Sequence, residues 1–319
     1  MDIKEFTAHA AEEVLEYLPE DLRETVSVEE TEVMKINDQI LHGLAFHRGD
    51  EPAPTFYLDD LHRLYEDGAC VGELLRGMAE TYIESYAYAG VGAAACSGAD
   101  CGVPFPVELP DLSYDKVKQK VGVRLLGVDY NRKFLETVPF REVGNGYALI
   151  ADAQIGASDG GVFSTVITNK MAEEYGYDMD IIFDAALDNA WRNNAAMFMP
   201  AEEVMSGGDW SEGETSCWLL TASRPRCGAA ALFYPGTQEM IADVLDEDYY
   251  AIPSSLHEFI IVRASVVNDP SHLCHLVKEA NRTIVCPEDL LSDNLLYYSK
   301  STGALTQVLP DEVYEDFAG

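Results

Sequence analysis

The fold is decided by the stretch YYAIPSSLHEFIIVRA at residues 249–264. Residues 249–253 and 258–264 are apolar segments typical of strands, and only residues 254–257 separate them. A connection this tight joins antiparallel neighbours. The stretch therefore predicts two paired strands, with Ser254, Ser255 and His257 at the turn between them.

The segments on either side of this stretch carry both strand and helix signals. Pro235 suits the first turn of a helix that extends to about residue 245. Asn268 or Asp269 can cap a helix that continues through residues 272–280. Strands are predicted at residues 217–222 and 227–234, and a closing hairpin at residues 295–299 and 305–308.

The earlier part of the chain has the same mixture. Residues 2–18 have the spacing of an amphipathic helix, and residues 26–33 and 40–46 read as strands joined by a turn at Asn37-Asp38. Further strands are predicted at 55–58, 123–128, 147–155 and 161–168, and helices at 58–88, 114–121, 170–175 and 178–192. Without a regular βα repeat, this order favours an α+β fold with mixed, mainly antiparallel sheets and packed helices.

Two or three subdomains are expected. A Gly- and Pro-rich stretch at residues 91–112 reads as a linker or long loop between an N-terminal unit (1–90) and a middle unit (113–205). A Gly-rich acidic loop precedes a C-terminal unit (215–309), and an acidic tail (310–319) ends the chain.

The charge balance is the most unusual property of the composition. The 319 residues include 56 acidic and 21 basic side chains, for a net charge of −35, while 47% hydrophobic residues can supply a core. Such a surface would repel nucleic acids and anionic membranes, so neither is an expected direct partner. The favoured hypothesis is an acidic, non-enzymatic binding protein with a basic protein partner. An alternative is an acidic nucleic-acid mimic that blocks a DNA- or RNA-binding protein.

The sequence favours a cytoplasmic protein. No secretory signal opens the chain, and no apolar run is long enough for a membrane span. Seven cysteines, an odd number, suit a reducing compartment. Cys96 and Cys101 lack a matching second pair, so no metal site and no cofactor are expected.

The turn at residues 254–257 carries the residue types of nucleophilic hydrolysis. Ser255 and His257 are candidate catalytic residues of a small-molecule hydrolase or transferase, the second alternative function. No GxSxG motif supports them, and a structural role for both in the turn is favoured over catalysis. Whether the protein is an enzyme stays open. Candidate ligand-binding residues are Tyr234, Gly236, Arg224, Arg226 and Glu258. The helix start at residues 234–236 beside two arginines can hold an anion, although a rigid strand-to-helix turn is the favoured interpretation.

Other histidines have weaker signals. His272 and His275 lie three residues apart on a predicted helix, where a solvated helix face is favoured over half of a metal site. His42 and His47 flank a strand, and Asp50, Asp59, Asp60 and His62 follow, but their spacing requires no metal. Asp59-Asp60 is interpreted as the cap of the following helix.

Four stretches carry a resemblance to a known family: APTFYL at 53–58, LFYPG at 232–236, IPSSLHE at 252–258, and CPEDLLSD at 286–293 followed by Tyr297-Tyr298. In order and spacing they resemble the bacterial "domain of unknown function 5688" family of gut-dwelling Firmicutes, over nearly the whole chain. The resemblance implies kinship, and it brings no established activity.

Overall fold

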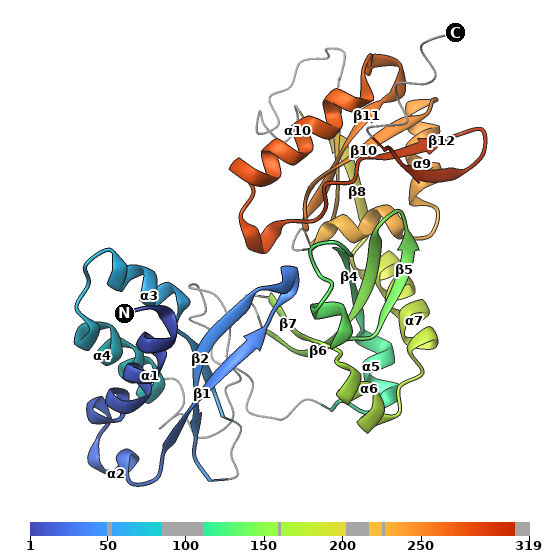
Figure 1. The fold of residues 1–319 in the computed structure, drawn as a ribbon. Coiled ribbons are helices and arrows are strands. Elements are labelled where there is room, and N and C mark those ends of the chain that lie inside the picture. Colours follow the sequence, from blue (N-terminus) through green and yellow to red (C-terminus); the bar gives the residue numbers. More distant parts are fainter. Residues whose placement is uncertain (50–52, 85–110, 159–160, 202–216, 225–226, 310–319) are drawn as a thin grey trace. The chain divides into compact units, whose positions relative to one another are not determined.

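The computed structural model describes residues 1–49, 53–84, 111–158, 161–201, 217–224 and 227–309 (Figure 1). The strands form three sheets with antiparallel pairing, and helices accompany each of them, so the predicted α+β fold is confirmed. The chain divides into two compact units. Unit 1 comprises residues 1–35, 39–111 and 155–163, and unit 2 comprises residues 36–38, 112–154 and 164–319.

Unit 1 packs helices against a three-stranded sheet of order β1-β2-β3. Asp2 and Glu5 form a capping box that starts the first helix, since each side chain accepts from the other residue's backbone N–H. The elements are α1 (Ile3–Glu13), η1 (Val14–Tyr17), α2 (Glu20–Arg23), β1 (Ser27–Met34), β2 (Ile40–His47), β3 (Thr55–Tyr57), α3 (Asp59–Glu66) and α4 (Val71–Tyr82).

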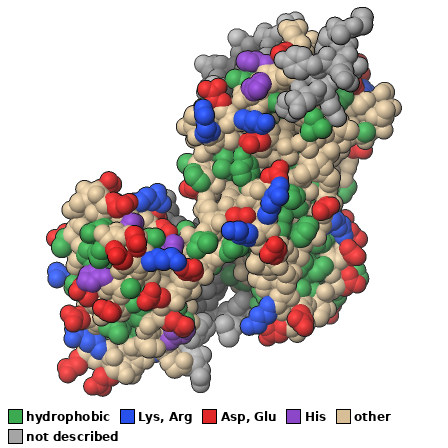
Figure 2. All heavy atoms as spheres, in the orientation of Figure 1, with side chains coloured by type: hydrophobic (Ala, Val, Ile, Leu, Met, Phe, Trp, Pro, Cys, Tyr) green, Lys and Arg blue, Asp and Glu red, His purple; other side chains and the backbone are tan. Residues whose placement is uncertain are grey.

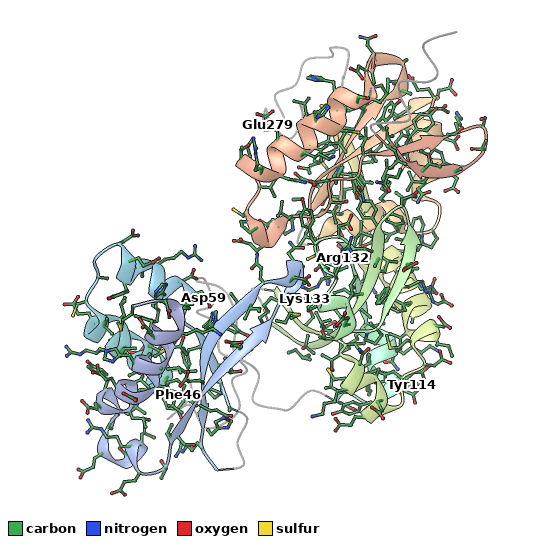
Figure 3. All side chains as sticks on the ribbon, viewed as in Figure 1. Phe46, Asp59, Tyr114, Arg132, Lys133 and Glu279 are labelled. Carbon is green, nitrogen blue, oxygen red and sulfur yellow. The ribbon has the colours of Figure 1, made fainter. Side chains whose placement is uncertain are left out.

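The core of unit 1 forms where the apolar face of α1 meets β2 and where η1 meets α4. Phe6 and Phe46 are almost fully buried, and the Phe46 ring, labelled in Figure 3, stacks on Tyr82 with 4.6 Å between ring centroids. Burial of an aromatic side chain of this kind contributes roughly 1.5–3 kcal/mol. The amphipathic spacing predicted for residues 2–18 is therefore the spacing that builds this core.

Unit 2 contains most of a four-stranded sheet, in which β6 pairs with β4, β5 and β7, and a six-stranded sheet of order β13-β12-β10-β11-β9-β8. Residues 155–163, at the end of β6 and the start of β7, are counted in unit 1. α7 lies against β4, and α10 lies against β10. The first elements are η2 (Ile36–Asp38), α5 (Tyr114–Lys120), β4 (Gly122–Gly127), η4 (Phe134–Glu136), β5 (Phe140–Gly144), β6 (Tyr147–Ser158), β7 (Gly161–Val166), α6 (Asn169–Tyr175), α7 (Met179–Asn193) and β8 (Ala196–Pro200). The others are β9 (Cys217–Ala222), η5 (Gly228–Phe233), α9 (Thr237–Leu245), β10 (Tyr249–Ser255), β11 (Glu258–Arg263), η6 (Ala264–Val266), α10 (Pro270–Thr283), η7 (Pro287–Asp289), β12 (Leu296–Ser299) and β13 (Ala304–Gln307).

The predicted hairpin at residues 249–264 is confirmed. Ser255 pairs with Glu258, which leaves Leu256 and His257 as the two residues of the turn. The predicted helix cap is also present, because the Asp269 side chain accepts from the backbone N–H of Ser271.

The strand predicted at residues 227–234 is wrong, because this segment forms the short helix η5. Alanine has the highest helix propensity, and a short apolar run does not distinguish a strand from a buried helix. Gly228 lets η5 lie directly against its neighbours. A Cβ on this residue would be 2.3 Å from Thr221 Oγ1 and 2.7 Å from the His257 carbonyl oxygen. The glycine therefore determines how closely η5 approaches β9 and the β10–β11 turn.

Residues 36–38 are joined to unit 2 by hydrogen bonds. Asn37 and Asp38 have positive φ angles of 64° and 52°, which suits the turn predicted there. The Asn37 side chain donates to the carbonyl oxygens of Pro287 and Leu290, 2.9 Å from each. The Asp38 carboxylate accepts from the backbone N–H groups of Lys133 and Phe134, the former labelled in Figure 3.

The predicted middle unit (113–205) and C-terminal unit (215–309) both lie almost entirely within unit 2. Residues 91–110 of the predicted linker and the predicted tail at 310–319 lie outside the described residues. Among the described helices, none combines the length and the apolar character that a bilayer crossing requires.

Candidate functional site

His257 is the centre of a polar cluster in unit 2. Its ring Nδ1 is 3.0 Å from the backbone nitrogen of Cys227, and its Nε2 is 3.1 Å from Asp289 Oδ1. The Cys227 N–H can only donate, so the neutral imidazole must accept at Nδ1 and carry its proton on Nε2. The ring therefore joins the start of η5 to η7.

Ser255 contacts the backbone of His257 rather than its ring. The Ser255 hydroxyl accepts from the His257 N–H at 3.1 Å, and Ser254 donates to Glu258 at 3.2 Å. A general base must direct its lone pair at the nucleophile. The structure brings Ser255, the last residue of β10, and His257, in the turn, together through this backbone contact. The hydroxyl does not face the imidazole, so a serine nucleophile with an imidazole base is not formed.

Sequence reasoning missed two partners of His257. Asp289 follows it by 32 residues and Cys227 precedes it by 30. Asp289 lies in the CPEDLLSD stretch that carries the family resemblance, but nothing in its spacing relates it to His257. Cys227 has a positive φ of 62° at the start of η5, a conformation that its sequence position does not reveal.

The candidate ligand-binding residues lie in different environments. Tyr234 is buried, and burial raises the pKa of its phenol to about 12, with the nearby Cys227 adding to the effect and a hydrogen bond to Asn194 opposing it. Gly236 is exposed before α9, with a φ of 77°. Arg224 is exposed, and its backbone N–H donates to Asn194 Oδ1 at 2.7 Å. Arg226 lies outside the described residues.

A buried ion pair lies close to the same cluster. Arg124 on β4 binds Asp152 on β6 through its Nε, and the Asp152 side chain is only 10% exposed. The guanidinium is near enough to Cys227 for the two to interact electrostatically. Asp152 Oδ1 is buried without a hydrogen-bond partner among the described residues. Removing either charge alone would leave the other buried and unpaired, so we assign this pair a structural role.

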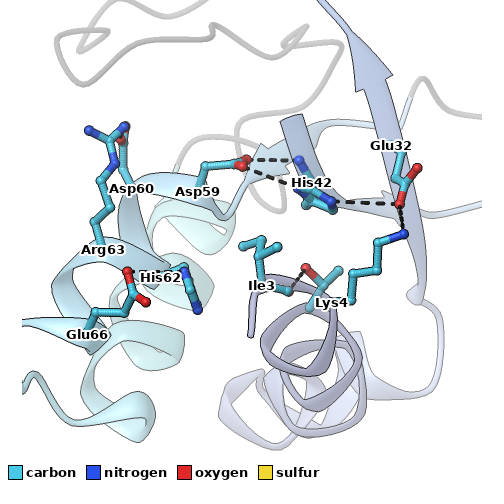
Figure 4. Close-up of polar contacts among 10 residues, drawn as sticks. Ile3, Lys4, Glu32, His42, Asp59, Asp60, His62, Arg63 and Glu66 are labelled. Carbon is cyan, nitrogen blue, oxygen red and sulfur yellow. Dashed lines mark hydrogen bonds and ion pairs between the residues drawn. The ribbon is translucent and has the colours of Figure 1, made fainter. Parts of the chain in front are cut away.

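His42 forms a second histidine centre, in unit 1 (Figure 4). Asp59 Oδ2 accepts the His42 backbone N–H at 2.9 Å, and Asp59 Oδ1 lies 3.3 Å from the ring Nδ1. On the other side of the ring, Nε2 is 3.7 Å from Glu32 Oε1. Glu32 also pairs with Lys4 at 3.2 Å. Both His42 and Asp59 were noted in the sequence, but their contact was not.

The interpretation of Asp59-Asp60 as a helix cap requires correction. Leu58 is the N-cap of α3, and no side chain caps this helix by a hydrogen bond. Asp59 and Asp60 lie in the first turn, where their charge favours the positive end of the helix dipole. Asp59 instead holds His42, and Asp60 pairs with Arg63.

A small hollow of about 180 Å³ opens beside His42. We call it the His42 hollow and define it by its lining residues Lys4, Thr7, Glu30, Thr31, Glu32 and His42. The residues come from α1, β1 and β2, so the hollow is built on the regular elements of unit 1.

The family model described as "Family of unknown function (DUF5688)" matches residues 3–300. The chain belongs to this family. The DUF5688 match covers both the His42 hollow and the His257 cluster, so each lies within the family's own region of the chain. No curated protein and no solved structure matches the chain.

His272 and His275 are exposed on α10, as a solvated helix face predicts. Across the described part of the chain, no group of three or more His, Cys, Asp or Glu side chains is arranged to hold a metal ion. Cys96 and Cys101 lie outside the described residues, as does Asp50.

Proposed function

We propose that this member of the DUF5688 family is a binding protein that meets a basic protein partner through an acidic face of unit 1. We define the acidic face by exposed carboxylates that follow one another from α1 to β1. They are Glu12, Glu16, Glu20, Glu24 and Glu30. Their lack of local counter-charge is the observation that carries the proposal.

The negative charge is concentrated at the N-terminal end of the chain. Residues 1–84 contain 21 acidic and 6 basic side chains, whereas residues 85–319 contain 35 and 15. The charge excess per residue is therefore about twice as high in the first segment. On the visible face of unit 1, red carboxylates clearly predominate over blue cations (Figure 2). A field of one sign speeds association with a partner of opposite charge.

Several cations of unit 1 bind groups other than carboxylates. Arg23 donates to the backbone carbonyls of Leu18 and Glu16, Lys35 lies over the Tyr57 ring, and Arg76 lies over the Tyr17 ring. None of the five carboxylates of the acidic face forms an ion pair with another described residue. The face consequently presents its charge to solvent.

The acidic face also contains repulsive neighbours. Glu20 and Glu24 are four residues apart in one helical turn, and like charges at this spacing destabilise a helix by roughly 0.2–0.5 kcal/mol per pair. A bound cation from a partner would relieve this repulsion. Binding and stability are thus coupled at the same side chains.

A fluorescent lysine-rich peptide tests the proposal, with its lysine-acetylated form as the uncharged probe. The combined substitution Glu12→Gln, Glu16→Gln, Glu20→Gln and Glu24→Gln should weaken binding. At about 0.5 kcal/mol for each exposed charge, the loss is roughly 2 kcal/mol, or about 30-fold in Kd. The matched control makes the same change of charge in unit 2, at the exposed residues Glu173, Glu174, Glu279 and Glu288.

Binding should also fall steeply between low and moderate salt, because exposed charges are screened. Equal effects of the two quadruple variants would show that net charge alone attracts the peptide and would remove the acidic face from the proposal. Failure of the wild-type protein to prefer the charged peptide over the acetylated one would refute the function itself. A pull-down from lysate at the two salt concentrations should recover basic proteins preferentially.

A further inference from the structure

We infer that the His42 hollow is a binding site for a single lysine side chain of the basic partner. This inference rests on the proposed function and specifies where one of the partner's cations is held. Three observations support it: an oriented histidine acceptor, a carboxylate that already holds an ammonium group, and a hollow beside both.

Asp59 determines the orientation of the His42 ring and which ring nitrogen carries the proton. Its carboxylate binds the backbone N–H and the ring Nδ1 of the same residue, at 2.9 and 3.3 Å. In its neutral form the ring therefore carries its proton on Nδ1 and keeps a lone pair on Nε2. The side chain is only 14% exposed, so the ring is held in place by its surroundings. Nε2 becomes a fixed acceptor in the wall of the hollow.

Glu32 shows that an ammonium group suits this position. Its Oε1 atom lies 3.2 Å from Lys4 Nζ and 3.7 Å from His42 Nε2 (Figure 4). Lys4 is 74% exposed, and an ion pair between two exposed side chains contributes at most about 1 kcal/mol. A lysine of a partner can therefore replace Lys4 with little loss. Lys4 acts as an internal competitor for the site.

The other lining groups complete a set of acceptors. Thr7 donates its hydroxyl hydrogen to the Ile3 carbonyl at 2.8 Å, which leaves its oxygen to accept. Glu30 adds a second carboxylate at the edge of the hollow. An ammonium group has three N–H donors and no acceptor, so carboxylate, imidazole and hydroxyl acceptors match its chemistry. The planar guanidinium of arginine needs a wider, forked arrangement of acceptors.

Two single-charge variants test the inference against general electrostatics. Lys4→Met and Arg76→Met each remove one exposed cation from unit 1 and keep an aliphatic stem. If Lys4 competes for the hollow, Lys4→Met should tighten binding of the lysine-rich peptide at least threefold more than Arg76→Met does. Glu32→Gln should weaken binding about tenfold, whereas Glu12→Gln, which also removes one negative charge, should weaken it about twofold.

A proton NMR titration gives a readout at the hollow itself. The ring signal of His42 should shift when the lysine peptide binds, and that of His9, which faces Glu13, should stay in place. An arginine-rich peptide should bind more weakly and shift His42 less. If Lys4→Met and Arg76→Met change binding equally, and the His42 signal stays in place while the peptide binds, the hollow is not the lysine site. The proposed role of the acidic face would be unaffected by that result. Absence of any binding by the wild-type protein would instead refute the proposed function.

Discussion

Replacing Gly228 by alanine is expected to destabilise unit 2 by about 3 kcal/mol. The new Cβ would lie 2.3 Å from Thr221 Oγ1, 2.7 Å from the Ala222 nitrogen and 2.7 Å from the His257 carbonyl oxygen. Two of these atoms belong to the backbone, so a strand or the turn has to move. Overpacking a core costs roughly 1–3 kcal/mol. Displacing Thr221 also disturbs its 2.8 Å hydrogen bond to His257, which adds about 1 kcal/mol.

A urea titration followed by tryptophan fluorescence measures this loss in unit 2. The three tryptophans, Trp191, Trp210 and Trp218, all fall within the residue range of that unit. Gly122→Ala is the matched control, because a Cβ on Gly122 would meet nothing within 4 Å. The control should stabilise by about 0.5 kcal/mol, chiefly through the unfolded chain. A Gly228→Ala variant within 0.5 kcal/mol of the wild-type protein would contradict the close packing of η5 on β9.

Two further predictions concern the same unit. His257→Ala and Asp289→Ala should each lower the free energy of unfolding by about 1–2 kcal/mol. A double-mutant cycle measured by urea unfolding should give a coupling energy above about 0.5 kcal/mol. If the two effects simply add, the 3.1 Å contact between His257 and Asp289 contributes nothing to stability. Alkaline pH should destabilise unit 2, because burial raises the pKa of Tyr130 and of Tyr234 from 10 to about 12 in the folded state. A raised folded pKa gives stability that is complete below pH 10 and is lost as the pH rises toward 12. The urea midpoint of unfolding should fall as the pH rises through this window, and it should fall less in Tyr234→Phe. If the midpoint of that variant falls as steeply with pH as that of the wild-type protein, the buried Tyr234 phenol is not a cause of the alkaline destabilisation.

The local parts of the fold could be predicted from the sequence. Apolar segments on both sides of residues 254–257 predict the β10–β11 hairpin, and Asn37-Asp38 predicts a turn because both residues tolerate a positive φ. η5 could not be recognised, since an apolar run of six residues suits a strand as well as a buried helix. The strand β8 was also missed. Its sequence, AMFMP, lacks β-branched residues, so it becomes a strand only by pairing with β9.

In the candidate sites, too, contacts between residues close in sequence could be predicted, and contacts between distant residues could not. Ser255 and His257 are candidates because they place the residue types of nucleophilic hydrolysis in one short connection, and the hydrogen bond that they form is a bond of the hairpin turn. Asp289 reaches His257 from η7, which no local pattern indicates. His42 and Asp59 are both visible in the sequence as candidates, but their spacing does not relate them, because they belong to β2 and α3 and meet only in the folded unit 1. Pairing across elements is a tertiary effect, so composition and spacing do not reveal it.

The three-residue segment at the β1–β2 connection has a practical consequence for anyone dissecting this chain. Unit 2 is discontinuous, and its smallest piece is encoded more than seventy residues before the next one. A fragment begun at residue 112 would lack Asn37 and Asp38, so two carbonyls and two backbone N–H groups would lose their partners. A truncation series should therefore supply that tripeptide through a designed linker, since an isolated C-terminal fragment would lack hydrogen-bond partners that belong to its own unit.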